Sequence, residues 1–451
     1  MKNVFVSEKS FYKRYFDVAM PIIAQNVITI GVNMMDTIML GDYGEVQLSA
    51  SSLANDYINI FQILCMGMGC GAAVLTAQYW GQKNLSHLKK TVALMLRVAA
   101  VISLLFTLSV IFFPSQIMSI YTNEADIVEK GALYFTWSIP TFFITGITMT
   151  LTQVMRSVRE VKVPLFASII GFFANIFFNW VFIFGHFGMP EMQIAGAALG
   201  TVLARCFEAA IIGVSFFVKD QKIGFKVKDL FEKAEDVGPL YVKYCIPVIA
   251  SDSLLGFGNT AVSIIVGHMG TAFTAAYAII AVIQRLATVI TSGMGQSAHT
   301  LTGNRIGEGK KELAYREALT MLLLTTVMGL FAAVVIRLAG PYIVGFYEIQ
   351  EETYETAMLM LDAVSIMIVF QAMQSVITKG VLRGGGDTGF CLMIDAVFLW
   401  IVSVPLGWYT GLVLHCNAFI VFLSLKADWA IKSIIGTIRV ISGKWIRDIQ
   451  S

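Results

Sequence analysis

Apolar segments of about 20 residues follow one another along the whole chain, and the segment from Val18 to Met35 contains no charged side chain. A helix of that length crosses the hydrocarbon core of a bilayer, which is about 30 Å thick. With 57% hydrophobic and only 14% charged residues, the composition disfavours a soluble globular domain. The runs do not alternate between apolar and polar residues, which favours helices over a β-barrel. The sequence therefore predicts an all-α integral membrane protein.

The apolar segments divide into twelve predicted transmembrane helices. The first follows a basic N-terminus without a small-residue cleavage site, so we expect it to be retained rather than removed as a signal peptide. The six cysteines form no CxxC pair and show no His spacing typical of a zinc site, which predicts neither a metal site nor a disulfide framework. The approximate ranges of the helices are 15–40, 53–80, 91–113, 131–155, 164–186, 194–218, 240–266, 273–302, 317–339, 356–380, 390–408 and 411–431.

The basic residues are distributed unevenly between the two sides of these helices. With the N-terminus inside, the inner segments hold 26 of the 32 Lys and Arg residues, whereas the outer loops hold only Lys130. This bias follows the positive-inside rule and predicts that both termini are cytoplasmic. We expect a multi-pass protein of the cytoplasmic membrane. Its basic loops are too short and too separated for a nucleic-acid interface.

The two halves of the sequence align with each other. An ungapped offset of 226 residues sets PIIAQNVITIGVNMMDTIMLGDYG (21–44) on PVIASDSLLGFGNTAVSIIVGHMG (247–270), with seven of the 24 positions identical. The same offset sets 67–81 on 293–307. Six helices is an even number, so both halves enter from the same side and the repeat is parallel. We expect two pseudo-symmetric six-helix lobes, at 1–218 and 240–451, joined by a cytoplasmic linker at 219–239.

Polar side chains form stripes on several of the predicted helices. On the first helix they recur every three to four residues, so they share one face that lipid would not tolerate. Pro21 and Pro247 fall at matching places and predict a kink in the first helix of each lobe. The first-helix stripe comprises Gln25, Asn26, Thr29, Asn33, Asp36 and Thr37, and the fifth-helix stripe Ser168, Gly171, Asn175 and Asn179.

Asp36 is the carboxylate of the first-helix stripe, and it lies towards the outer end of its span. It is a candidate for binding and releasing a coupling ion, and an acid at the membrane interface is the structural alternative. Arg205 and Glu208, three residues apart on the sixth helix, can pair with each other. The sequence leaves open the pairing of the intramembrane charges Arg205, Glu208, Asp252, Arg285, Asp362 and Asp395. The further substrate-cavity candidates are Gln25, Thr29, Asn33, Met34, Asp252, Asn259, Gln284 and Arg285.

Several segments in order along both lobes resemble the multidrug and toxic compound extrusion (MATE) family, of the bacterial type within the wider MOP superfamily. They are Pro21 with MMDTIMLGDYG, TAQYWGQKN (76–84), VMRSVRE (154–160), NIFFNWVFIFG (175–185), GAALGT (196–201) and LRGGGDT (382–388). The resemblance implies a secondary antiporter that exports organic, often cationic, compounds in exchange for H⁺ or Na⁺.

The resemblance also implies a set of coupling residues. The acid of the family's first-helix motif matches Asp36, and its partners match Tyr134, Asn175, Asn179 and Thr201. Members with an Asn–Asp pair on the fifth helix differ from this chain, which has two asparagines there, so the choice between H⁺ and Na⁺ at Asp36 stays open. Asp36 aligns with Val262 in the repeat, which favours coupling in the N-terminal lobe.

Other classes of function are less well supported by the sequence. A flippase of lipid-linked precursors from the same superfamily is the main alternative, kept open by Arg205 and Arg285. No HExxH, GxSxG or P-loop signature is present, so we expect neither an enzyme nor direct use of ATP. We expect no cofactor beyond the coupling ion, no nucleic-acid partner, a monomer, and small organic cations as substrates.

Overall fold

The computed structural model describes residues 5–41, 43–220, 222–347 and 349–449, and within these ranges it contains helices and no strand. Two elements are 3₁₀ turns, η1 and η3, and four are π-helical, η2, η4, η5 and η6. The bounds are α1 Lys9–Gly41, α2 Glu45–Gly81, α3 Leu85–Phe112, α4 Pro114–Tyr121, α5 Ala125–Ser157, α6 Lys162–Phe184, η1 His186–Gly188, α7 Gln193–Val214, η2 Ser215–Lys219, η3 Val227–Phe231, α8 Gly238–Gly267, α9 Thr271–Gly307, α10 Lys311–Gly345, α11 Glu351–Gln374, η4 Ser375–Leu382, α12 Thr388–Val397, η5 Phe398–Ser403, α13 Val404–Trp408, η6 Tyr409–Val413, α14 Ala418–Leu425 and α15 Ala427–Ile441.

Eleven helical segments of the described chain are long and apolar enough to cross a membrane. The last of them runs continuously through Thr388–Val413, across the break expected near residue 410. The chain beyond it forms two short helices instead of one span at 411–431. The first, α14, starts late because the side chain of Asn417 caps it by accepting from the backbone of Ile420. The second, α15, begins after Lys426, where the backbone leaves the helical conformation.

The chain divides into two compact units. Unit 1 comprises Met1–Ile23, Ala77–Lys83 and Ile246–Ser451, and unit 2 comprises Ala24–Thr76 and Asn84–Cys245. Three helices, α1, α2 and α8, therefore contribute residues to both. The change of unit in α1 comes two residues after Pro21, and that in α8 comes one residue before Pro247, between Cys245 and Ile246.

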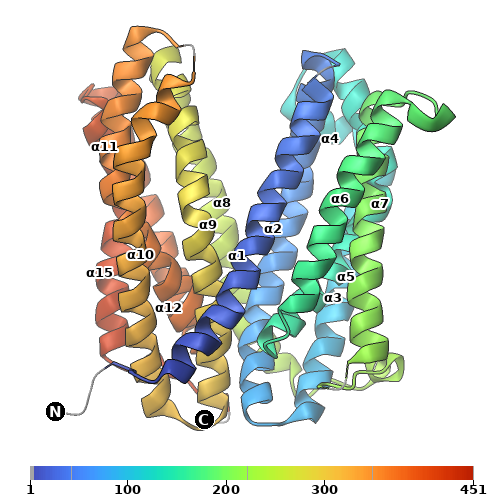
Figure 1. Cartoon of the computed structure of the whole chain (residues 1–451), viewed down its shortest axis with the longest axis vertical. Coiled ribbons are helices and arrows are strands. Elements are labelled where there is room, and N and C mark those ends of the chain that lie inside the picture. The colour runs from blue at the N-terminus through green and yellow to red at the C-terminus, as the bar shows by residue number, and fades with distance from the viewer. Residues whose placement is uncertain (1–4, 42, 221, 348, 450–451) are drawn as a thin grey trace. The chain divides into compact units, whose positions relative to one another are not determined.

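Within unit 2, α6 and α7 pack along one another, and α5 packs against α7 (Figure 1). An apolar core of this unit includes Phe61 of α2 and Phe135 and Phe142 of α5, which are almost fully buried. The linker predicted at 219–239 lies in this unit, where Arg97 of α3 donates to the backbone oxygen of Leu230 at 2.8 Å.

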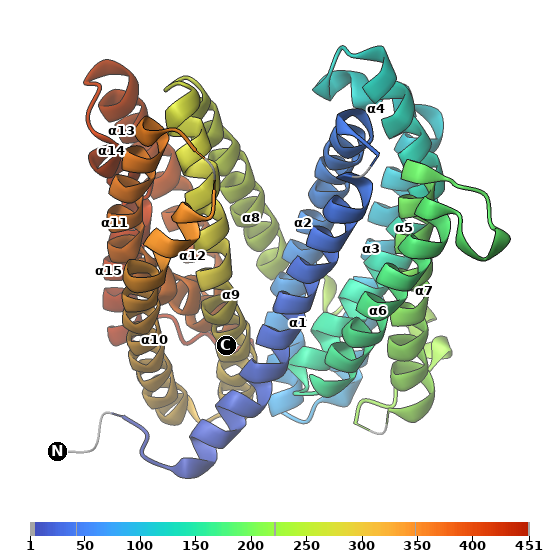
Figure 2. The ribbon, with the colours of Figure 1, turned by 45° about the horizontal axis from the view of Figure 1, so that its top comes forward.

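Within unit 1, α10 packs along α11, and α14 lies against α11 (Figure 2). One of its two cores joins the two ends of the sequence, because Phe11 and Tyr15 pack with Met294 and Trp445. Trp445 and Tyr15 are fully buried, and the Tyr15 hydroxyl donates to the backbone oxygen of Met294 at 3.2 Å.

Candidate functional site

The polar stripes of α1 and α6 meet in unit 2, beside α7. The first half of α7 is rich in Ala and Gly, which lets its backbone approach α6 closely. A Cβ atom at Gly200 would lie 2.2 Å from Oδ1 of Asn179, so only glycine fits there without displacing the asparagine. This close approach aligns the polar residues of α6 and α7.

Asp36 lies at one end of a chain of hydrogen bonds. The amide nitrogen of Asn179 donates to Oδ1 of Asp36 at 2.6 Å and also lies 3.4 Å from Oδ1 of Asn175. Asn175 in turn donates to the hydroxyl of Thr201 at 3.3 Å. Both asparagines are buried, at 1% exposure or less, whereas Asp36 is half-buried. Four of the five coupling candidates therefore lie in one connected group.

The fifth coupling candidate, Tyr134 on α5, has a different partner. Its hydroxyl lies 3.4 Å from the amide nitrogen of Asn55 on α2, and Tyr134 itself is 3% exposed. Asn55 is not among the residues predicted from the sequence. Asn55, Asn59 and Gln62 recur at helical spacing, and this polar stripe is the signal that could have identified it.

A second polar group lies further along the same three helices. Arg205 Nη1 is 2.7 Å from Glu208 Oε2, which confirms that the two residues pair. The other oxygen of Glu208 accepts from Ser168 at 3.0 Å, and Ser168 accepts from Gln25 at 3.0 Å. Arg156 at the end of α5 also donates to Gln25. Glu208 is only 6% exposed, so its charge is compensated by partners rather than by solvent.

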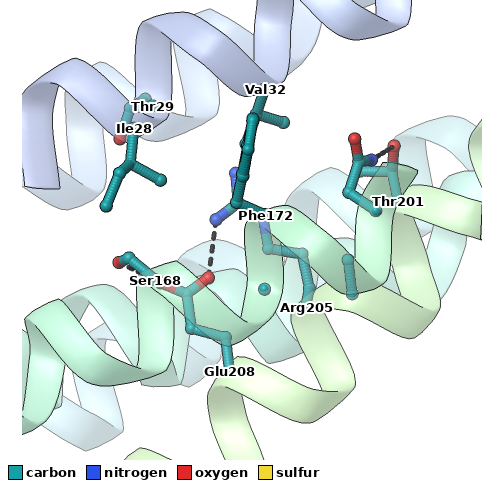
Figure 3. Close-up of a pocket in the computed structure, with 11 residues that line it drawn as sticks. Ile28, Thr29, Val32, Ser168, Phe172, Thr201, Arg205 and Glu208 are labelled. Carbon is teal, nitrogen blue, oxygen red and sulfur yellow. Dashed lines mark hydrogen bonds and ion pairs between the residues drawn. The ribbon is translucent and has the colours of Figure 1, made fainter. Parts of the chain in front are cut away.

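A small cavity separates the two polar groups (Figure 3). Its volume of about 20 Å³ is enough for one water molecule. Asn175 and Thr201 line one part of it, and Ser168, Arg205 and Glu208 line another. In Figure 3 the side chains of Arg205 and Glu208 reach each other from neighbouring turns of α7. The site is therefore a polar strip with a single gap.

The MatE family model matches residues 21–181 and again 247–409, which together cover most of the chain. The chain belongs to the MatE family. The two matched segments begin at Pro21 and Pro247, the positions that the internal repeat aligns.

Relatives and solved structures of MATE proteins agree with this assignment. The chain is 22% identical over 439 residues to the probable multidrug resistance protein NorM of Thermotoga maritima, covering 96% of this chain and 93% of the relative. It is 20% identical to the protein DETOXIFICATION 12 of Arabidopsis thaliana, covering 94% of this chain and 87% of the relative.

A crystal structure of MATE in complex with MaL6 matches with a TM-score of 0.87 and 16% identity, over 96% of this chain and 97% of the other. An outward-facing multidrug resistance MATE transporter matches with a TM-score of 0.87 and 15% identity, over 98% and 99%. The protein thus has the MATE fold of a multi-pass membrane transporter.

The remaining substrate-cavity candidates of this MATE protein differ in exposure. Thr29 lines the small cavity and Gln25 is buried in the Glu208 group. Of the others, Gln284 is half-buried, and four are exposed: Asn33, Met34, Asn259 and Arg285.

In unit 1 of this MATE protein, most of the unassigned charges are paired. Arg383 holds Asp252 through two contacts, at 2.8 and 3.2 Å, which makes Asp252 part of a buried ion pair. Asp362 pairs with Arg337 at 2.9 Å. Asp395 lies 3.1 Å from Lys432 and accepts from Ser251 at 2.5 Å. The structure shows no ion pair for Arg285 among the described residues.

Proposed function

We propose that this protein is an antiporter of the cell membrane that exports organic cations in exchange for protons, with both termini in the cytoplasm. The observation that carries the proposal is the half-buried carboxylate of Asp36, held by Asn179 at 2.6 Å inside an apolar span. Such an acid can take up and release one ion per cycle. The names of the relatives, which describe multidrug resistance, support small organic molecules as substrates.

The groups around Asp36 favour H⁺ over Na⁺ as the coupling ion. Sodium binding needs several oxygen atoms that converge on the ion, because hard cations take oxygen ligands. Asp36 instead faces an amide nitrogen, and the same nitrogen lies within hydrogen-bond distance of Asn175, so rotating the Asn179 amide would lose both contacts. This arrangement of amide groups opposes a metal cation more than a proton.

The flippase alternative is less well supported by the geometry. A cavity that holds a pyrophosphate needs free cationic side chains. Of the two arginines that keep this alternative open, Arg205 is already neutralised by Glu208 at 2.7 Å, which leaves Arg285 where a pyrophosphate needs several cations. A lipid-flipping assay on the reconstituted protein is expected to be negative.

Proteoliposomes test the proposal directly. With ethidium as the probe, we expect a proton gradient alone to drive transport and a sodium gradient alone to fail. Asp36→Asn should abolish proton-driven transport without loss of folded protein. Asp362→Asn is the matched control, because it removes another intramembrane carboxylate, in the other unit. Transport driven by sodium alone would overturn the proton assignment, and normal transport by Asp36→Asn would overturn the role of that residue.

A further inference from the structure

Arg205 pairs with Glu208 on α7. It also lines the small cavity together with Asn175 and Thr201, which belong to the hydrogen-bonded group of Asp36. It is one helical turn from Thr201 and almost one turn from Glu208 on α7, so all three share a face of that helix. It contacts Glu208 directly, and its charge also acts on Asp36. Any change in how completely Glu208 neutralises Arg205 therefore changes the field at Asp36.

The ionised form of Glu208 is held firmly in place. Its two carboxylate oxygens have separate donors, Arg205 at 2.7 Å and Ser168 at 3.0 Å. Gln25 fixes Ser168 in turn by donating to its hydroxyl at 3.0 Å. Arg205 and Glu208 both lie on α7, whereas Ser168 comes from α6 and Gln25 from α1. The full set of hydrogen bonds around Glu208 therefore forms only when the three helices are packed.

The other groups that face Asp36 are neutral. From α6 they are Asn175 and Asn179, and from α5 the nearest titratable group is Tyr134, which is bonded to Asn55. Among the groups of the described chain that act on Asp36, Arg205 is the cation. Arg156 lies nearer to Glu208, at the other end of the strip, where it donates to Gln25.

We propose that Glu208 sets the pH range in which Asp36 exchanges its proton, by neutralising Arg205. This inference rests on the proposed function, in which Asp36 carries the transported proton. Removing the charge of Glu208 leaves a full positive charge on Arg205, which stabilises ionised Asp36. Removing Arg205 instead leaves an unbalanced negative charge on Glu208, which favours protonated Asp36.

Infrared titration of the reconstituted full chain measures the proton on Asp36 without any substrate. The carbonyl stretch of a protonated carboxylic acid is recorded from about pH 4 to about pH 9, and the spectrum of Asp36→Asn is subtracted in each background, which isolates Asp36. We expect Glu208→Gln to move the half-titration of Asp36 to lower pH by roughly one to two units. Arg205→Gln should move it to higher pH.

Two further variants separate this effect from damage to the fold. Arg205→Gln with Glu208→Gln removes both charges together and should return the midpoint to within about half a unit of the wild type. Asp362→Asn removes a carboxylate from the ion pair with Arg337 in unit 1 and should not move the midpoint. Should Glu208→Gln fail to fold, the remaining variants still give different expectations: a midpoint near that of the wild type for the double variant and a shift to higher pH for Arg205→Gln.

The infrared titration distinguishes a failure of the inference about Glu208 from a failure of the proposed function. A wild type without a titrating band that depends on Asp36 would contradict the proposed function itself. A normal Asp36 titration that is identical in the wild type and in Glu208→Gln would leave the proposed function intact and overturn the inference about Glu208. A shift to lower pH in both Glu208→Gln and Arg205→Gln would also overturn it. Removing opposite charges should move the midpoint in opposite directions, so two shifts in the same direction would indicate a structural disturbance instead.

Discussion

Lys432 lies between two buried carboxylates, with Nζ 3.1 Å from Asp395 and 3.0 Å from Asp428. All three residues are at most 3% exposed. Removing one partner of a buried ionic group leaves an uncompensated charge and costs about 3–5 kcal/mol. We therefore expect Lys432→Met to lower the midpoint of thermal unfolding in detergent clearly.

Lys444→Met is the control for this experiment. It removes an exposed lysine and should change the free energy of unfolding by no more than about 0.5 kcal/mol. Equal midpoints for the two variants would show that the buried group contributes little.

Gly200 offers a test of the contact between α6 and α7. An added Cβ would lie 2.2 Å from Oδ1 of Asn179, so Gly200→Ala must push that side chain away from Asp36. We expect proton-driven ethidium transport to fall by about tenfold or more, on the order of the loss of one charge-assisted hydrogen bond. Gly213→Ala on the same helix is the control, because a Cβ there meets nothing within 4 Å. Full activity of Gly200→Ala would mean that the position of Asn179 is unimportant.

A second acid beside Asp36 should change the pH dependence of transport. Asn179→Asp places two carboxylates in contact, and such a pair cannot ionise fully, so one of them retains a proton to higher pH. We expect the pH of half-maximal transport to rise by roughly one unit or more. Asn84→Asp makes the same substitution at the N-cap of α3, where either residue caps the helix, and should have no effect. An unchanged profile in Asn179→Asp would argue against proton exchange at Asp36.

The segment between the two halves of the sequence is attached to α3 by Asp236. Its hydrogen bond with Lys90, at 2.7 Å, is the main reason that the pKa of Asp236 lies below its usual value. Because the folded pKa is lowered, this contribution is present above the ordinary pKa of about 4 and is lost as the pH falls through the lowered value. At neutral pH, Asp236→Asn should therefore speed tryptic cleavage at the nearby lysines. The wild type should lose protection against an acid-active protease as the pH falls below about 4.

Glu235 provides the control for that experiment. It is the neighbour of Asp236, but its contact with Lys233 is 3.8 Å long and both side chains are almost fully exposed. Glu235→Gln should therefore be cut at the wild-type rate. If both variants are cut at the same rate, the ion pair with Lys90 does not hold the segment.

The spacing of apolar residues was sufficient to predict the fold class, since that pattern repeats over many residues. The family was predicted from the resemblance of several segments in order along both halves, which the family model confirms. The spacing of polar residues places Asn175 and Asn179 on one face of α6. It does not determine which partner each side chain meets, because that depends on contacts between distant segments. Arg383 and Asp252 are 131 residues apart, and neither carries a local signal for the other.

The last helices of the described chain differ from the prediction. Hydropathy favoured a break near residue 410, but the structure continues through π-helical turns to Val413. Lys432 and Asp428 look like residues of a cytoplasmic boundary in sequence. They are instead buried because each is neutralised by a specific partner.

The core that contains Phe11, Tyr15 and Trp445 has a consequence for biosynthesis. Tyr15 and Trp445 are both fully buried in it, yet they are separated by almost the entire length of the chain. During translation the start of α1 leaves the ribosome more than 400 residues before Trp445. The start of α1 therefore completes its packing only after residue 445 has been translated, and a product truncated before it would expose this apolar surface to the quality-control machinery of the cell.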